Sequence, residues 1–322
     1  MTSDLPEIQL ESYLRLNRAS LEEWLAGLRT VYGFERLKCT GGASQEGVGA
    51  LSALQAEGGD LACIYASQDM EIAGGRAEHL SLVVPLEGVV EFASDSLHWS
   101  RLNNPAVVPA ATRFNLSLSA GSQVMYLALS SAERSRLVDD GQYGCLSDVN
   151  CLVTNYLFRA GFFLDDGHAR AMTRDLFRSL KAKFETGQAI AVPDRPEPDR
   201  RLIRVIRKIQ LEPNWEFDLH ELASHSGVSE RNLFYLMKRE TGMTPYRFFQ
   251  RCRLLRVRRR LVDCRCELPH ISWYAADEGF SHLGRFAALY RRHFGELPSE
   301  TVQWRRNLLV PAGLSAQDEA VG

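Results

Sequence analysis

The sequence predicts an α+β chain in which a small antiparallel β-barrel with flanking helices precedes an all-helical domain. Short apolar runs separated by turn residues, between about residues 60 and 130, predict the barrel. One helical unit that occurs twice in the C-terminal third predicts the helical domain. A length of 322 residues allows two domains that each bury a core of their own.

The first predicted element is a helix that begins after Ser20. The Ser20 side chain can cap this helix, and Glu23, three residues on, can complete a capping box. The helix is expected to end near Gly33, because glycine commonly terminates helices.

The barrel prediction rests on β-type runs with turn chemistry between them. Turn residues separate the runs, which is typical of a small barrel or sandwich. These turn sequences are Gly74-Gly75, Glu87-Gly88, Asn103-Asn104-Pro105 and Ala120-Gly121. We expect a cupin-like barrel whose interior offers a small-molecule pocket. The runs occupy residues 61–65, 79–84, 89–92, 106–108, 114–118 and 124–129.

Two helical segments follow, over about 146–163 and 168–184, and either cover the barrel or pair with a second copy of the chain. A proline-rich, charged stretch then predicts an interdomain linker over 186–199. The chain is thus expected to divide into an N-terminal domain, this linker, a helical domain and a tail. The expected ranges are 1–185 for the N-terminal domain, 200–306 for the helical domain and 307–322 for the tail.

Composition excludes several classes of protein. The chain is 45% hydrophobic and 24% charged, as expected of a globular protein. Its apolar runs are too short to span a membrane, and no signal sequence opens the chain, so we expect a cytoplasmic protein without membrane contact. Seven scattered cysteines are expected to be free thiols. Cys264 and Cys266 with His270 have a spacing that a metal would need, but a further ligand is missing, and we expect no metal and no cofactor.

The net charge of −2 conceals an asymmetry between the two parts of the chain. Residues 195–306 hold 22 Lys and Arg against 14 Asp and Glu, a balance of +8. The remainder therefore carries −10. This division of charge is typical of a basic module that binds a polyanion, and equally of a solvated charged surface. The charge alone does not distinguish the two, so the order of the residues has to be considered.

The repeat in the basic region supplies that arrangement. The pattern Leu222-Ala223-x3-Gly227-Val228-Ser229 recurs 52 residues later as Tyr274-Ala275-x3-Gly279-Phe280-Ser281. After one inserted residue, Gly242-x-x-Pro245 recurs as Gly295-x-x-Pro298. Small alanines suit closely crossing helices, the first glycine suits a turn with positive φ, and the serine suits an N-cap. Each unit is therefore a predicted helix-turn-helix.

The second helix of such a unit enters the major groove of DNA, with its outward residues facing base edges. Leu233, Phe234 and Met237 are predicted to point inward in the first unit, and Phe286, Leu289 and Phe294 in the second. Arg231 and Arg285 are the leading candidates because a guanidinium can bond both acceptors of guanine. A phosphate contact or a surface ion pair is the alternative for both. The candidates for reading bases are Arg231, Asn232, Tyr235, Lys238, Arg239, His282 and Arg285.

A run without helix breakers, residues 246–261, predicts one continuous helix between the units. Such a rod would hold both recognition helices on one side of the duplex, about one helical turn apart. The candidates for phosphate contacts are Ser229, Arg251, Arg258, Arg259, Ser281 and Arg291.

Residues 277–299, which open with Asp277-Glu278-Gly279-Phe280-Ser281 and close with Gly295-Glu296-Leu297-Pro298-Ser299, resemble the signature of AraC/XylS-type bacterial transcription regulators. The resemblance is closest to the XylS-like branch and covers about 200–306. It implies binding to one half-site of promoter DNA, contact with RNA polymerase, and usually activation. Ala288 departs from the pattern, because XylS-like members often have a polar or acidic residue there.

The resemblance also implies that the N-terminal part senses a small organic effector, often an aromatic acid in this branch, and forms a homodimer. Arg76, His79 and Arg113 are candidates to face an effector carboxylate, although each is more commonly a surface residue. The alternative is an N-terminal domain that responds to a protein partner or only dimerises. An enzyme is not expected, because the sequence lacks a His-x-His metal pair, a G-x-S-x-G motif and a P-loop.

Overall fold

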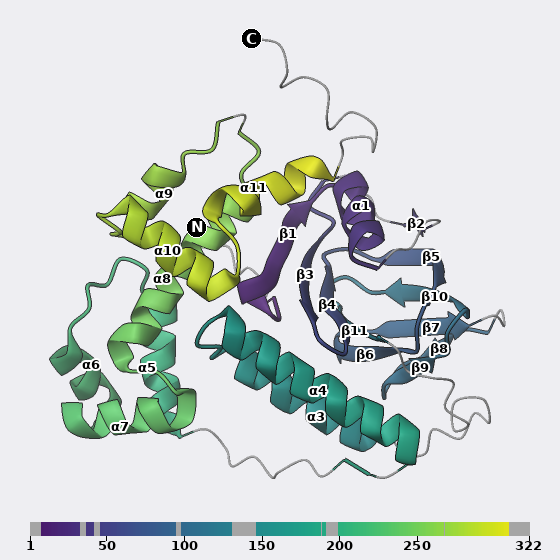
Figure 1. The fold of residues 1–322 in the computed structure, drawn as a ribbon, viewed down its shortest axis with the longest axis horizontal. Coiled ribbons are helices and arrows are strands. Elements are labelled where there is room, and N and C mark those ends of the chain that lie inside the picture. The colour runs from purple at the N-terminus through teal and green to yellow at the C-terminus, as the bar shows by residue number, and fades with distance from the viewer. Residues whose placement is uncertain are drawn as a thin grey trace.

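The computed structural model describes residues 8–32, 37–41, 46–94, 98–130, 146–187, 189–190, 199–266 and 268–308. Two antiparallel sheets and a pair of long helices form the N-terminal part, and seven helices of the described chain form the C-terminal part (Figure 1). No described helix combines the length and the apolar character that crossing a membrane would require.

The first sheet has six strands in the order β1-β3-β4-β11-β6-β9, and the second has five in the order β2-β5-β10-β7-β8. The two sheets share no strand, so the predicted closed barrel is wrong, and the observed unit is a two-sheet sandwich. The strands of the first sheet are Leu14–Ala19, Gly49–Ala56, Gly59–Ala66, Gln123–Leu129, Ser81–Glu87 and Ala106–Val108. Those of the second are Lys38–Thr40, Met70–Arg76, Arg113–Leu118, Val90–Ser94 and Ser100–Arg101.

The six predicted runs all became strands, but the sequence analysis missed β1, β2, β3, β5 and β8. Six successive residues of β3, 49–54, are buried, and only Ser52 interrupts their apolar character, so the strand lacks the alternation that marks a half-exposed strand. β5 contains Gly74 and Gly75, which were interpreted as turn residues. Gly75 lies against the Phe114 ring, where a Cβ would approach the ring atoms to 2.8 Å, so it serves close packing instead.

The helix α1, Leu21–Tyr32, begins as predicted. The Glu23 backbone amide donates to Ser20 Oγ over 3.2 Å, and the Ser20 amide donates to Glu23 Oε2 over 2.7 Å. These two bonds confirm the capping box. The helix ends at Tyr32, next to the predicted Gly33, which lies outside the described residues.

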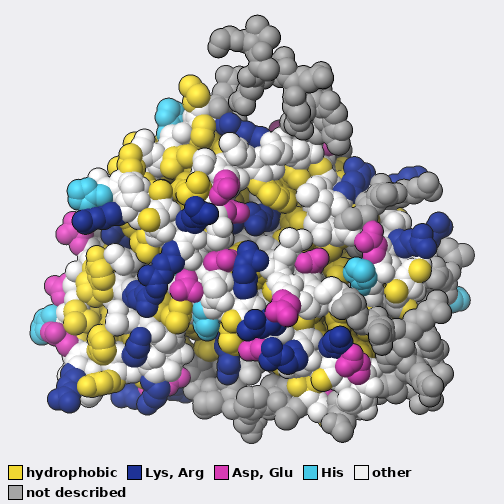
Figure 2. All heavy atoms as spheres, in the orientation of Figure 1, with side chains coloured by type: hydrophobic (Ala, Val, Ile, Leu, Met, Phe, Trp, Pro, Cys, Tyr) yellow, Lys and Arg dark blue, Asp and Glu magenta, His cyan; other side chains and the backbone are white. Residues whose placement is uncertain are grey.

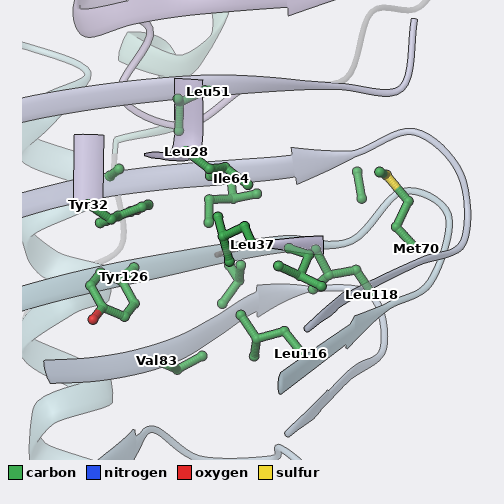
Figure 3. Packing of buried hydrophobic residues seen from close by; sticks show 14 of the residues in the cluster. Leu28, Tyr32, Leu37, Leu51, Ile64, Met70, Val83, Leu116, Leu118 and Tyr126 are labelled. Atoms are coloured by element: carbon green, nitrogen blue, oxygen red, sulfur yellow. The ribbon is translucent and has the colours of Figure 1, made fainter. Parts of the chain in front are cut away.

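The space between the two sheets is filled by an apolar core. Tyr32, Leu51, Ile64, Leu116 and Tyr126 point toward one another from both sheets and from α1 (Figure 3). The Tyr126 ring lies edge-on to the Tyr32 ring at 4.5 Å, which is a favourable aromatic geometry. In this region the described side chains form a packed core.

The outer face of the six-stranded sheet is covered by α3, Ser147–Ala160, and α4, Asp166–Thr186 (Figure 1). Val153 and Tyr156 of α3 and Leu176 and Leu180 of α4 are buried in one cluster with residues of that sheet. The predicted helices are confirmed, and of the two alternatives, covering the sheet is the one observed. The predicted linker begins where α4 ends, but residues 188 and 191–198 lie outside the described residues.

The C-terminal part consists of helices around α8, a rod over Pro245–Val262. This rod confirms the continuous helix predicted between the two units. It starts at Thr244, whose hydroxyl accepts from the Arg247 amide over 3.3 Å, with Pro245 in the first turn. The other helices are α5 Arg200–Leu211, α6 Leu219–Ser226, α7 Glu230–Thr241, α9 Ile271–Asp277, α10 Leu283–Phe294 and α11 Pro298–Asn307.

Candidate nucleic-acid interface

The first repeat unit is α6 and α7 joined by a tight turn. Gly227 has φ +78°, and its amide donates to Ala223 O over 3.0 Å, so the glycine closes α6 in the left-handed region. Ser229 Oγ accepts from the Asn232 amide over 3.3 Å and caps α7. Gly242, with φ +72°, ends α7. The turn, the cap and the terminator were all predicted from sequence.

The second unit, α9 and α10, has the same turn and the same helix terminator as the first, but it differs at the N-cap of its second helix. Gly279 has φ +72°, and Gly295, with φ +76°, ends α10. The N-cap position of α10 is His282, and its side chain makes no capping bond. Ser281 stands one residue earlier, so its predicted capping role is wrong.

The inward faces of α7 and α10 are buried against the rest of the helical part. Leu233 and Met237 are fully covered, as predicted, and so are Phe286 and Phe294. Phe234 is 41% exposed, so its prediction as an inward residue is wrong, and Leu236 is buried on that side of the helix instead. At 100° per residue, Leu236 and Met237 lie on either side of Leu233 on the face of α7 that packs inward.

The outward faces carry all of the predicted base-reading side chains, and the structure exposes every one of them. Arg231 lies over the Tyr235 ring at 5.7 Å, so these two form one cationic and aromatic patch on α7. Lys238 Nζ donates to Gly242 O over 3.1 Å, and Arg239 pairs with Glu240 at 2.6 Å. These exposed bonds are weak and allow both side chains to turn to a ligand. The exposed set is Arg231, Asn232, Tyr235, Lys238, Arg239, His282 and Arg285.

The basic character of the helical part is visible on its surface, where Lys and Arg side chains lie among apolar and acidic ones on the left of the view (Figure 2). Ser229, Ser281 and Arg291 are exposed, so these phosphate candidates are accessible. Their contacts with DNA stay predictions.

The prediction of phosphate contacts for two arginines of α8 is wrong for this arrangement of the chain. Arg251 is 4% exposed and Arg258 is 1% exposed. Arg258 donates to Glu296 Oε1 over 2.9 Å and to Leu14 O over 3.1 Å, so it joins α8 to the N-terminal sheet. Neither guanidinium can reach DNA while the two parts of the chain are in contact. Arg259 is partly exposed but forms an ion pair with Glu11, so its charge is already engaged.

These contacts belong to a larger interface between the N-terminal sheet and the C-terminal helices. Arg15 of β1 pairs with Glu296, and Asn17 Nδ2 donates to Asp263 over 3.0 Å. Burial alone would raise the pKa of the Glu296 carboxyl, but the charges of Arg258 and Arg15 outweigh it and hold that pKa below its ordinary value. The carboxylate is therefore ionised and holds one guanidinium from each part of the chain.

Sequence reasoning missed this interface because charged residues on a basic helix are normally interpreted as surface. One signal was present. Arg251 and Arg258 are seven residues apart, which places both on the same face of α8. Apolar residues that are buried along this helix, such as Leu254, Leu255 and Leu261, surround the two arginines.

The effector candidates do not converge on a site. Arg76 and Arg113 are opposite one another in the β5–β10 ladder, and both side chains are exposed, as is His79. Two like charges directly opposite on a sheet repel each other, so they turn into solvent. The structure therefore gives no support to these three residues as the lining of an enclosed pocket. Among the described residues, no group of three or more His, Cys, Asp or Glu side chains is placed to hold a metal.

The geometry defines a double helix-turn-helix domain, and comparisons with known proteins agree. Residues 222–303 match the family described as a helix-turn-helix domain. A transcriptional activator of the XylDLEGF operon from Pseudomonas putida is 36% identical over 103 residues, which is 32% of this chain and 31% of that protein. The transcriptional activator RhaS of Escherichia coli O157:H7 is 32% identical over 98 residues, 30% of this chain and 33% of that protein.

The C-terminal part of the chain is therefore a helix-turn-helix domain, and it is similar to those of the matched transcriptional activators. A solved structure, a probable AraC family transcriptional regulator from Rhodopseudomonas palustris CGA009, is 32% identical, with a TM-score of 0.31. The match covers 33% of this chain and 96% of the chain in the solved structure. The chain spans about a third of the length of the curated relatives it matches. Those relatives are transcriptional activators and not enzymes.

Proposed function

We propose that the chain is a transcription regulator that binds promoter DNA sequence-specifically through α7 and α10. One observation carries the proposal. α7 and α10 bury their apolar faces and expose all seven predicted base-reading side chains. Exposed arginine, asparagine and tyrosine at the start of such a helix are the side chains that read base edges in the major groove.

The rod supports a bipartite mode of binding. α8 has 18 residues and is therefore roughly 27 Å long. A rod of this length separates its two units by a distance close to one turn of DNA, about 34 Å. In the proposed complex, α7 and α10 enter successive major grooves from one side of the duplex.

The finer proposal is an activator controlled by a small organic effector and active as a homodimer that contacts RNA polymerase. The names of the matched relatives, which are transcriptional activators, support activation. The N-terminal sandwich, a cupin-like unit in this proposal, would carry the effector and dimer functions. A second candidate is an N-terminal part that responds to a protein partner or only dimerises. The packed core between the sheets favours that candidate over a pocket inside the sandwich.

The test of DNA binding is selection of sites from random duplex DNA with the purified full-length chain. Enrichment of one motif with two half-elements about one helical turn apart supports the proposal. Arg285→Ala should change the motif at one position, while Arg178→Ala, an exposed arginine on α4, should leave it unchanged. If no motif is enriched, the proposal fails. Saturable thermal stabilisation by a small organic solute would favour the effector candidate over the partner candidate.

A further inference from the structure

A groove of about 470 Å³ lies where the N-terminal part meets the C-terminal helices. Its walls come from the segment before β1, from α3 and the turn after it, and from α5 and α8. The volume is within the range of small-molecule sites. Because both parts of the chain supply walls, anything bound here would touch the two together.

Most of the wall is apolar. Leu10, Leu86, Leu157, Phe158, Ile206 and Leu255 line the groove. Phe158 and Phe162, which also lines it, lie edge to face with their ring centroids 5.1 Å apart. An apolar or aromatic body would therefore lose water on entry and find aromatic partners.

Arg251 is the basic residue among those that line the groove, and it is 4% exposed. One terminal nitrogen, Nη2, donates to Ser12 Oγ over 3.0 Å and to Ala160 O over 3.4 Å. Its Nε is buried and has no hydrogen-bond partner. Among the described residues, no carboxylate lies within ion-pair distance of this guanidinium, so a buried cation stands without a counter-ion.

Such a cation is energetically unfavourable unless an anion pairs with it. Burial lowers the pKa of Arg251, which reflects the same penalty on its charged form. Glu11 also lines the groove, but its carboxylate is held by Arg259. Among the described residues, the groove therefore combines an apolar wall with a buried cation, and an anionic ligand would complete the ion pair.

We propose that this groove binds an organic monocarboxylate with an apolar or aromatic body, whose carboxylate pairs with Arg251. The guanidinium would meet the carboxylate, and the apolar wall would cover the body. Because Arg251 is part of the rod α8, the ligand would bridge the N-terminal part and the double helix-turn-helix. An effect of the ligand on DNA binding rests on the proposed function, whereas binding in the groove does not.

The test is calorimetric titration of the full-length chain, without DNA, using 4-phenylbutyrate and its uncharged analogue 4-phenylbutan-1-ol. A charge-assisted bond to a buried guanidinium should make the acid bind about tenfold more tightly than the alcohol. Arg251→Gln should reduce the affinity for the acid to that for the alcohol. Equal affinities for acid and alcohol in the unmodified chain, or no binding of either, would overturn the proposal.

Arg251→Gln could also disturb the fold, so a second variant leaves Arg251 intact. Thr154 is an exposed residue of α3 in the groove wall, and Thr154→Trp should fill the groove and abolish binding of the acid. Cys151→Trp, an exposed position on the same helix outside the wall, should bind as the unmodified chain does. Unchanged binding in Thr154→Trp would overturn the proposal. Site selection with the same preparation decides DNA binding separately, so failure of one claim does not imply failure of the other.

Discussion

The guanidinium of Arg305 in α11 donates two hydrogen bonds of 2.7 Å to the carboxylate of Glu23 in α1. The two residues are 282 positions apart, and both are buried. Arg305 Nη1 also donates to Val262 O over 3.0 Å, at the end of the rod. One side chain therefore ties the N-terminal sandwich to both the rod and the last helix of the DNA-binding domain.

Arg305→Ala is expected to lower the free energy of unfolding by about 3–5 kcal/mol. The substitution leaves the buried Glu23 carboxylate with only the half-exposed Arg265, 3.5 Å away, as its cation, and a poorly compensated buried charge is costly. Urea denaturation of the full-length chain measures the change. Arg178→Ala serves as the control, because its pair with Asp175 is exposed and should contribute less than about 1 kcal/mol. Equal effects of the two substitutions would show that burial of the Arg305 pair has no energetic consequence.

The same pair predicts a loss of stability in acid. Burial alone would raise the pKa of Glu23, but hydrogen bonds from Arg305 and Ser20 lower it from 4.5 to about 2. Because the folded pKa lies below the ordinary value, the stabilisation is complete above pH 4.5 and is lost as pH falls toward 2. Thermal melts across this range should show a steeper decline for the unmodified chain than for Glu23→Gln. Parallel declines would contradict the assignment.

Arg285→Ala should weaken binding to the selected DNA site by roughly 1–3 kcal/mol and relax the preference at one base position. Arg285 is exposed near the start of α10, where a guanidinium can reach the acceptors of guanine. Titration of the site and of its single-base variants measures both effects. An equal loss on every sequence would show that Arg285 contacts phosphate.

The two classes of arginine in the C-terminal part should respond differently to substitution. Arg291→Ala, at an exposed position, should lower the salt dependence of DNA binding by about one unit while stability stays unchanged. Arg258→Ala should instead destabilise the chain, because it removes one of the two guanidinium groups that pair with the buried Glu296 and the bond to Leu14 O. Salt titrations and urea denaturation of both variants separate the effects. A stable Arg258→Ala chain with a reduced salt slope would restore the phosphate role for Arg258.

Local signals determined much of the DNA-binding part in advance. Gly227 and Gly242 take the left-handed conformations that their positions required, and Ser229 forms the predicted cap. The sequence repeat predicted where both helix-turn-helix units lie along the chain, and the run without helix breakers predicted the rod between them. These features follow from the conformational freedom of glycine and from unsatisfied amides at helix ends, which depend on neighbours in sequence. Ser281 shows the limit of this reasoning, because the second unit starts one residue later without a side-chain cap.

Local signals in the sequence predicted the two helix-turn-helix units, the rod between them and most of the apolar faces, because those properties depend on residues within a few positions of one another. The pairing of the strands into two sheets and the burial of Arg251 and Arg258 follow instead from contacts between distant parts of the chain. The burial of the two arginines depends on partners more than ninety residues away, such as Ala160 for Arg251 and Leu14 for Arg258. A guanidinium is stable in solvent or within a set of buried acceptors, and the sequence of its own helix does not distinguish the two environments.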